Sequence, residues 1–104
     1  MFLFDVRKTV MAQPLEVLEV LADVLRNLGY SKVNLHRNLL WLNAELTGKE
    51  KNSLDEVFVV VVTCVPYGRN TEFLFSIQTN KERDSAEQQG NLILDQFAVR
   101  QPGS

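Results

Sequence analysis

Apolar and polar residues alternate with a period of two at the start of the chain. Phe2, Phe4 and Val6 fall on one side of this alternation, and Asp5 falls on the other. Because successive side chains of a β-strand point to opposite faces, the pattern predicts a strand over residues 2–10 with one face buried.

The segment that follows has the periodicity of a helix. Pro14 suits the first helical turn and Gly29 suits the position just past the end, so residues 15–28 are predicted to be helical. Polar residues occupy only a narrow stripe of this helix. The positions predicted to be buried are Val17, Leu18, Val20, Leu21, Val24, Leu25 and Leu28. A helix with so wide an apolar face needs neighbours on more than one side.

Residues 30–46 fit two kinds of structure. The leucines of this segment keep a helical spacing at one set of positions and a strand spacing at another. We predict a strand, because the asparagine and histidine residues of the segment weaken a helix. Residues 36–38 are predicted to form a bulge or a tight hairpin that resets the alternation. The register that places Leu42 and Ala44 in the core turns Trp41 to the opposite face of the sheet.

The stretch over residues 55–66 is apolar at nearly every position, including those that a half-solvated strand gives to polar residues. A turn over residues 66–70 and a cleanly alternating strand over residues 72–79 follow it, which predicts a β-hairpin. We predict that the turn pairs Val65 with Thr71. In that register the even-numbered side chains of the first strand point away from the helices.

Residues 84–87 have the pattern of a capping box, which predicts the start of a second helix. The positions predicted to be buried on this helix are Ala86, Ile93, Leu94 and Phe97. Gly90 lies inside the helix and costs about 1 kcal/mol relative to alanine. A turn at Gly90 followed by a strand over residues 92–99 is the alternative.

Together these elements predict an α+β domain with the order β-α-β-β-β-α. The expected architecture is a two-layer sandwich, in which an antiparallel sheet of three to five strands has two helices on one face. The chain has 104 residues, which suits a single domain. We assign residues 1–100 to this domain and residues 101–104 to a flexible tail.

Two layers leave one face of the sheet without a cover. In the predicted register this face carries several large apolar side chains, a kind of patch that soluble monomers seldom expose. The predicted interface residues are Trp41, Phe58, Val60, Val62, Cys64 and Leu74. A homodimer formed through this face is the simplest prediction, because one self-complementary patch closes a two-fold assembly. The alternative is that the second helix or the N-terminal strand covers the face within one chain.

The composition narrows the range of partners. The net charge is -2, so the chain lacks the positive field that attracts nucleic acid, and we predict no nucleic-acid partner. No apolar run reaches the roughly 18 residues that cross a bilayer, and the N-terminus lacks the pattern of a signal peptide. We therefore predict a cytoplasmic protein without a membrane partner.

Few residues are candidates for catalysis or metal binding. His36 is the sole histidine and Cys64 the sole cysteine, so the ligands of a zinc site cannot be assembled at motif spacing. Valines surround Cys64 in the sequence, which is typical of a buried thiol rather than a nucleophile. No nucleotide-binding motif occurs, and we predict neither a cofactor nor a metal.

The sequence favours a non-enzymatic protein-binding or adaptor module that self-associates through its apolar sheet face. Tyr67 and Arg69 lie at the predicted hairpin tip, where recognition residues are often found. The alternative function is a small-molecule-binding protein, or a small enzyme, with an apolar pocket between sheet and helices. In that case Tyr67, Arg69, His36 or Cys64 would supply its polar groups.

Overall fold

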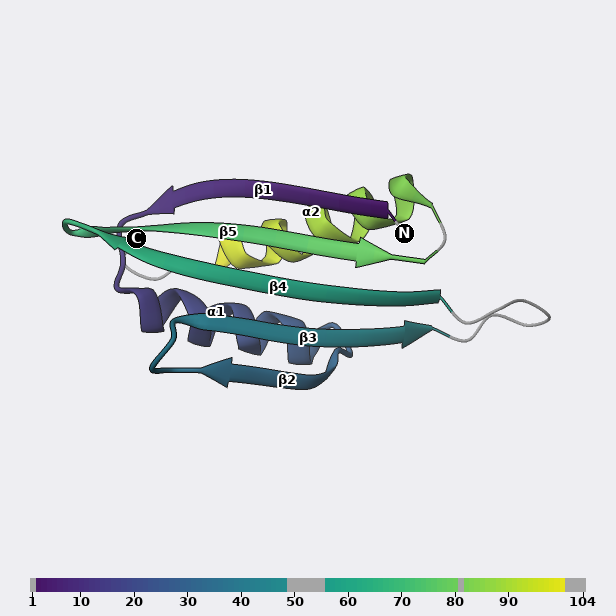
Figure 1. Cartoon of the computed structure of the whole chain (residues 1–104), viewed down its shortest axis with the longest axis horizontal. Helices are drawn as coiled ribbons and strands as arrows, with labels where there is room; N and C mark the ends of the chain where they lie inside the picture. The colour runs from purple at the N-terminus through teal and green to yellow at the C-terminus, as the bar shows by residue number, and fades with distance from the viewer. Residues whose placement is uncertain (1, 49–55, 81, 101–104) are drawn as a thin grey trace.

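The computed structural model describes residues 2–48, 56–80 and 82–100, which form five strands and two helices (Figure 1). The strands are β1 (Phe2–Val10), β2 (Ser31–His36), β3 (Trp41–Gly48), β4 (Glu56–Tyr67) and β5 (Asn70–Thr79). The helices are α1 (Pro14–Asn27) and α2 (Arg83–Val99). The tail predicted for residues 101–104 lies outside the described residues.

The strands form one antiparallel sheet in the order β1-β5-β4-β3-β2. Both helices pack on one face of this sheet, α1 against β2, β3 and β4, and α2 against β1 and β5 (Figure 1). The sheet is not closed into a barrel, so the predicted α+β two-layer architecture is confirmed. The most apolar strand, β4, occupies the middle of the sheet.

The order of elements differs from the prediction by one strand. Where the sequence predicts a single strand, the chain forms β2 and β3, which are joined by a turn over residues 37–40. His36 and Trp41 face each other across this hairpin. The predicted reset of the alternation is therefore a hairpin, and it adds a strand to the sheet. Leu42 and Ala44 of β3 are fully buried in the core, as predicted.

The helix α1 has the ends that the sequence predicts. Pro14 is its first residue, and Gly29 lies just past its end with a positive φ of 92°. Glycine adopts such a φ without strain, which is why it often follows a helix. The buried residues of α1 are Val17, Leu18, Leu21, Ala22, Val24 and Leu25. Val20 and Leu28 were also predicted to be buried, but they are only partly buried.

The helix α2 confirms the helix predicted for the C-terminal segment and excludes the alternative of a turn at Gly90 followed by a strand. It begins at Arg83, before the predicted capping box, and Glu82 at its N-cap position makes no side-chain capping bond. Its buried residues are Ala86, Gly90, Ile93, Leu94 and Phe97, which include all four that were predicted. A Cβ atom at Gly90 would lie 2.6 Å from Cδ2 of Phe4 on β1. Glycine at this position therefore lets β1 and α2 approach each other closely.

The β4–β5 hairpin has a tight turn. Tyr67 pairs directly with Asn70, so the turn contains only Gly68 and Arg69. Gly68 has a φ of 63° at the first of these two positions. Two-residue hairpin turns require a positive φ there, because the backbone twist of such turns matches the twist of the flanking strands. Gly68 thus supplies the conformation that this hairpin needs.

The predicted pairing of Val65 with Thr71 is wrong, since Val65 pairs with Glu72. A shift of one residue moves every side chain of a strand to the other face of the sheet. The β4 side chains predicted for the open face therefore lie in the core beneath the helices. These residues are Phe58, Val60, Val62 and Cys64, all of them buried.

Candidate functional site

The outer face of the sheet is the face that points away from both helices. Along β4 it presents valines at alternate positions except at Thr63, and Leu74 of β5 lies opposite this threonine. We define the central apolar strip as Val57, Val59, Val61, Val65 and Leu74. The exposed fractions of Val61, Val65 and Leu74 are 37%, 54% and 37%. The middle of the sheet thus carries accessible apolar side chains on the face that the helices leave open.

Polar side chains flank the strip on both neighbouring strands. Val61 pairs with Asn43 on β3 and with Ser76 on β5. The apolar area is therefore about one strand wide at this level. It differs from the patch that the sequence predicts in its β4 residues, because the observed register places Phe58, Val60, Val62 and Cys64 in the core.

Ion pairs lie on either side of the strip. Nε of Arg7 on β1 is 3.4 Å from Oε1 of Glu72 on β5. On the opposite side, Nζ of Lys32 on β2 is 3.4 Å from Oε2 of Glu45 on β3. Pairs as exposed as these contribute little to the stability of the fold. They give the outer face an apolar centre with charged margins.

Trp41 points to the outer face, as predicted, and lies opposite Thr63 of β4. The imidazole of His36 on β2 stacks on its indole ring, with ring centroids 4.0 Å apart and an angle of 10° between the planes. The chain itself therefore covers one side of the indole, and Trp41 remains only partly buried. Through this stacking, Trp41 of β3 contacts β2 on the outer face. The indole also extends the apolar surface of the outer face beyond β4.

The structure separates the predicted interface residues into two groups. Trp41 and Leu74 lie on the outer face, whereas the other four lie in the core. Sequence reasoning missed the four valines of the central apolar strip, because β4 is apolar on both faces and its own pattern favours neither. The signal that identifies them is Gly68, since a glycine followed by one further residue is typical of a two-residue hairpin turn.

Cys64 is not placed for nucleophilic chemistry. Its side chain is buried on the core side of the sheet, whereas His36 lies on the outer face, so the two cannot act as a pair. Burial raises the pKa of the Cys64 thiol to about 11. The thiol therefore stays protonated at neutral pH. The buried cysteine predicted from the sequence is confirmed.

Tyr67 and Arg69 are both exposed at the tip of the β4–β5 hairpin. Tyr67 is the last residue of β4, and Arg69 is the second residue of the turn. They lie where the sequence places them, and their role in recognition stays a prediction.

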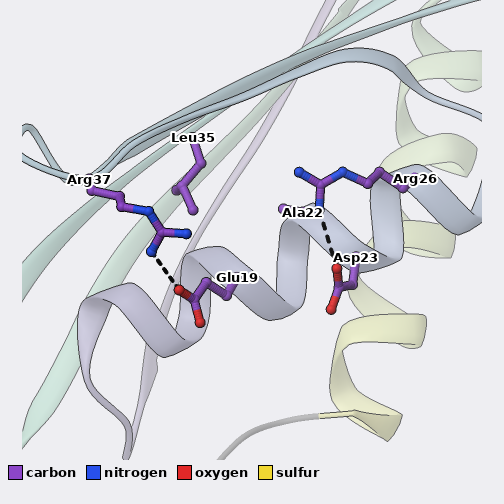
Figure 2. Close-up of a pocket in the computed structure, with 6 residues that line it drawn as sticks. All are labelled: Glu19, Ala22, Asp23, Arg26, Leu35 and Arg37. Carbon is purple, nitrogen blue, oxygen red and sulfur yellow. Dashed lines mark hydrogen bonds and ion pairs between the residues drawn. The ribbon is translucent and has the colours of Figure 1, made fainter.

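A shallow polar depression of about 250 Å³ lies between α1 and β2 (Figure 2). Its charged residues form two ion pairs: Nη1 of Arg37 is 2.6 Å from Oε1 of Glu19, and Nη1 of Arg26 is 3.3 Å from Oδ1 of Asp23. Each arginine points toward its own carboxylate partner (Figure 2). Because all four charged side chains of the lining are paired and largely exposed, the depression offers little to a charged ligand.

An apolar hollow of about 430 Å³ lies near the start of α1, at the end of the sheet. It is lined by Gln13, Pro14, Leu15, Leu40 and Pro66. The four polar residues that the sequence suggests for a ligand pocket do not line this hollow. Its lining therefore provides apolar contact with little capacity to orient a polar ligand.

Within the described ranges, no three His, Cys, Asp or Glu side chains form a group that could hold a metal ion. In the same ranges, no helix is long and apolar enough to cross a membrane. The absence of a cofactor or nucleic-acid partner and the cytoplasmic location stay predictions.

No protein family model matches the chain, and no curated protein sequence matches it. Among solved structures, the crystal structure of TTHA0849 from Thermus thermophilus is similar, with a TM-score of 0.47 and 10% sequence identity. The match covers 94% of this chain and 95% of that chain. A similarity of this degree carries no functional argument.

Proposed function

We propose that this chain is a non-enzymatic protein-binding module that self-associates through the outer face of its sheet. The observation that carries the proposal is the position of the central apolar strip on the middle strand of a sheet whose helices all lie on the other face. Apolar side chains that stay accessible in this way lose unfavourable contact with water when a second surface covers them.

The size of the outer face supports a stable contact. The five strands average nine residues, and at about 3.3 Å per residue and about 4.8 Å between strands the sheet presents a face on the order of 700 Å². A specific protein interface of standard size buries about 800 Å² on each partner. The outer face is therefore comparable in size to one side of such an interface without a contribution from the helices.

A second copy of the chain is the partner that the arrangement favours. A two-fold axis lying in the plane of the interface can place β4 of one copy on β4 of the other, because β4 is the central strand. The apolar strip then meets itself, and the ion pairs Arg7–Glu72 and Lys32–Glu45 lie toward the margins. An apolar centre with a polar rim is the usual anatomy of a protein interface.

The test is the native mass of a variant that places a charge in the strip. Val61→Asp should halve the mass of the wild-type assembly at micromolar concentration, because the new carboxylate would be buried against an apolar surface. Leu92→Asp is the matched control, since Leu92 on α2 is 40% exposed and lies away from the outer face. Its mass should equal that of the wild type.

Circular dichroism on each variant establishes that the fold is intact. If Val61→Asp unfolds the chain, Val65→Lys provides the same test at a more exposed position. A wild-type chain that is monomeric at micromolar concentration would sink the proposal, and so would folded strip variants with the mass of the wild type.

A second candidate function is the binding of a small apolar molecule in the hollow near the start of α1. Its volume of about 430 Å³ lies within the range of ligand pockets, about 300 to 1,000 Å³. With 1-octanol as a probe, ligand binding should raise the thermal midpoint of the wild type but not that of Leu15→Asp. Equal midpoints with and without 1-octanol in the wild type would exclude this function for alcohols of that size.

A further inference from the structure

The two edges of the sheet are built differently. β2 forms one edge, with six residues, a register irregularity between Ser31 and Asn34, and a positive φ of 52° at Lys32. Short, irregular edge strands resist pairing with another chain. β1 forms the other edge with nine residues, no proline and an uninterrupted register against β5. In the described part of the chain, β1 pairs with β5 alone.

The helix layer also covers β1 incompletely. Phe2 is 43% exposed, and Phe4 and Val6 on the same face are only partly buried. Their partners on β5, Ile77 opposite Phe4 and Phe75 opposite Val6, are fully buried. The inner face of β1 therefore retains apolar surface from Phe2 to Val6, next to the exposed Lys8, that a neighbouring strand would cover.

We infer that β1 pairs antiparallel with β1 of a second copy, which joins two five-stranded sheets into one continuous sheet. The backbone restricts the register of this pair. In a strand, the N–H and C=O groups of alternate residues point to the same edge, so residues that pair across the new contact must both be even-numbered or both be odd-numbered. Pairing over the whole of Phe2–Val10 places Val6 opposite Val6 of the second copy.

The charges on β1 favour that same register. With Val6 on the two-fold axis, Asp5 of each copy lies opposite Arg7 of the other, which forms two favourable pairs on the outer face. A shift to the adjacent permitted register in one direction places Asp5 opposite Asp5, and a shift in the other places Arg7 opposite Arg7. Like charges directly opposite each other are destabilising. One register alone therefore combines full overlap with complementary charges.

This symmetry is also the reason for choosing a second copy as the partner. Charged residues on an edge strand commonly prevent pairing with other chains. Here the opposite charges of Asp5 and Arg7 are placed symmetrically about Val6, so they disfavour register shifts that bring like charges together but complement the same strand turned through two-fold symmetry. Arg7 also keeps its contact with Glu72 of its own chain, 3.4 Å away.

The contact through β1 is independent of the contact proposed for the outer face. Its two-fold axis runs perpendicular to the sheet, so both outer faces remain accessible on the same side of the joined sheet. If both contacts form, each can be removed without the other, and each removal should halve the native mass.

The test reverses the charges on β1. Asp5→Arg and Arg7→Asp should each halve the native mass at low ionic strength, because each creates like-charge pairs across the two-fold axis. The double variant with both substitutions should recover the wild-type mass, since complementarity is restored in the opposite sense. An equimolar mixture of the two single variants should also recover it, because each chain then supplies the charges that the other lacks.

Circular dichroism verifies that each variant is folded, as expected for side chains that are exposed in the monomer. Hydrogen exchange gives a second readout that does not depend on mass: backbone amides of β1 should exchange faster in the single variants than in the double variant. The inference is overturned if the single variants keep both the mass and the β1 protection of the wild type. It is also overturned if the folded Val61→Asp variant, which lacks the outer-face contact, is already a monomer.

Discussion

Tyr67 and Asn70 face each other directly across the β4–β5 hairpin, with only Gly68 and Arg69 between them. This pair determines which face of β4 meets the helices. If the turn were one residue longer on one side, the β4 valines now in the core would lie on the outer face, and those on the outer face would lie in the core. The division between core and outer face thus depends on a turn at the far end of the hairpin.

Substitution of Gly68 should destabilise the fold through its backbone conformation alone. A Cβ atom at Gly68 would meet no atom within 4 Å, but its φ of 63° is unfavourable for residues with a side chain. We expect Gly68→Ala to lower the free energy of unfolding by about 1 to 2 kcal/mol, measured by urea denaturation. Arg69→Ala is the control and should change it by less than about 0.5 kcal/mol. Equal losses in both variants would contradict this account of the turn.

Val60 and Val61 are neighbours on β4 and should respond differently to the same truncation. Val60 is fully buried, whereas Val61 is on the outer face and 37% exposed. We expect Val60→Ala to lower the free energy of unfolding by about 1.5 to 3 kcal/mol, and Val61→Ala by less than about 1 kcal/mol. Urea denaturation in dilute protein checks this without a contribution from self-association. The opposite ranking would mean that β4 has the other register.

Gly90 should be one of the helix positions where alanine is worse than glycine. Alanine is favoured over glycine in a helix by about 1 kcal/mol, but its Cβ would lie 2.6 Å from Cδ2 and 2.7 Å from Cε2 of Phe4. Overpacking typically costs about 1 to 3 kcal/mol. We therefore expect Gly90→Ala to destabilise the fold in the wild type and to be neutral or stabilising in a Phe4→Leu background. A double-mutant cycle with no coupling between the two positions would show that the contact does not limit this site.

Cys64 should make the folded state less stable at alkaline pH. Burial raises the pKa of its thiol from about 9 to about 11 in the folded state. Between these values the unfolded chain loses its proton while the folded chain keeps it, so the free energy of unfolding falls as pH rises from about 9 to about 11. Burial raises the pKa of Tyr30 as well, which acts in the same direction.

The contribution of Cys64 is measured by comparing urea denaturation of the wild type and Cys64→Ala from pH 8 to pH 11. The wild type should lose stability more steeply, because the variant lacks the contribution of the Cys64 thiol. Iodoacetamide should also label Cys64 far more slowly in the folded chain than in urea at pH 8. Parallel pH profiles, or rapid labelling of the folded chain, would show that the thiol is accessible to water.

The parts of the fold that could be predicted from the sequence are those with two agreeing signals. For α1, the apolar periodicity coincides with Pro14 and Gly29 at its ends, and the structure places the helix there. For β5, the regular alternation of large apolar residues with smaller or polar ones identifies the core face. Where such signals agree, local preferences and tertiary packing favour the same structure.

The parts that were not predicted correctly lack a signal within the strand itself. Val59, Val60, Val61 and Val62 are chemically identical, so no property of the strand itself distinguishes its two faces. The distinction comes from the pairing with Phe75 and Ile77 on β5, which the turn at Gly68 sets. The wrong register also affected the predicted interface, because four of its six residues belong to the core. The start of α2 at Arg83 rather than at the capping box has no evident cause in the contacts of its first turn.

The contact between Phe4 and Gly90 joins the first strand of the chain to its last helix, and β1 pairs with β5 over residues that are far apart in sequence. Such non-local contacts form only after the intervening chain is complete. During synthesis on the ribosome, β1 can therefore form its native contacts only after both β5 and α2 have emerged. Until then its phenylalanines lack the contacts that β5 and α2 provide in the folded chain, and its backbone lacks the pairing with β5.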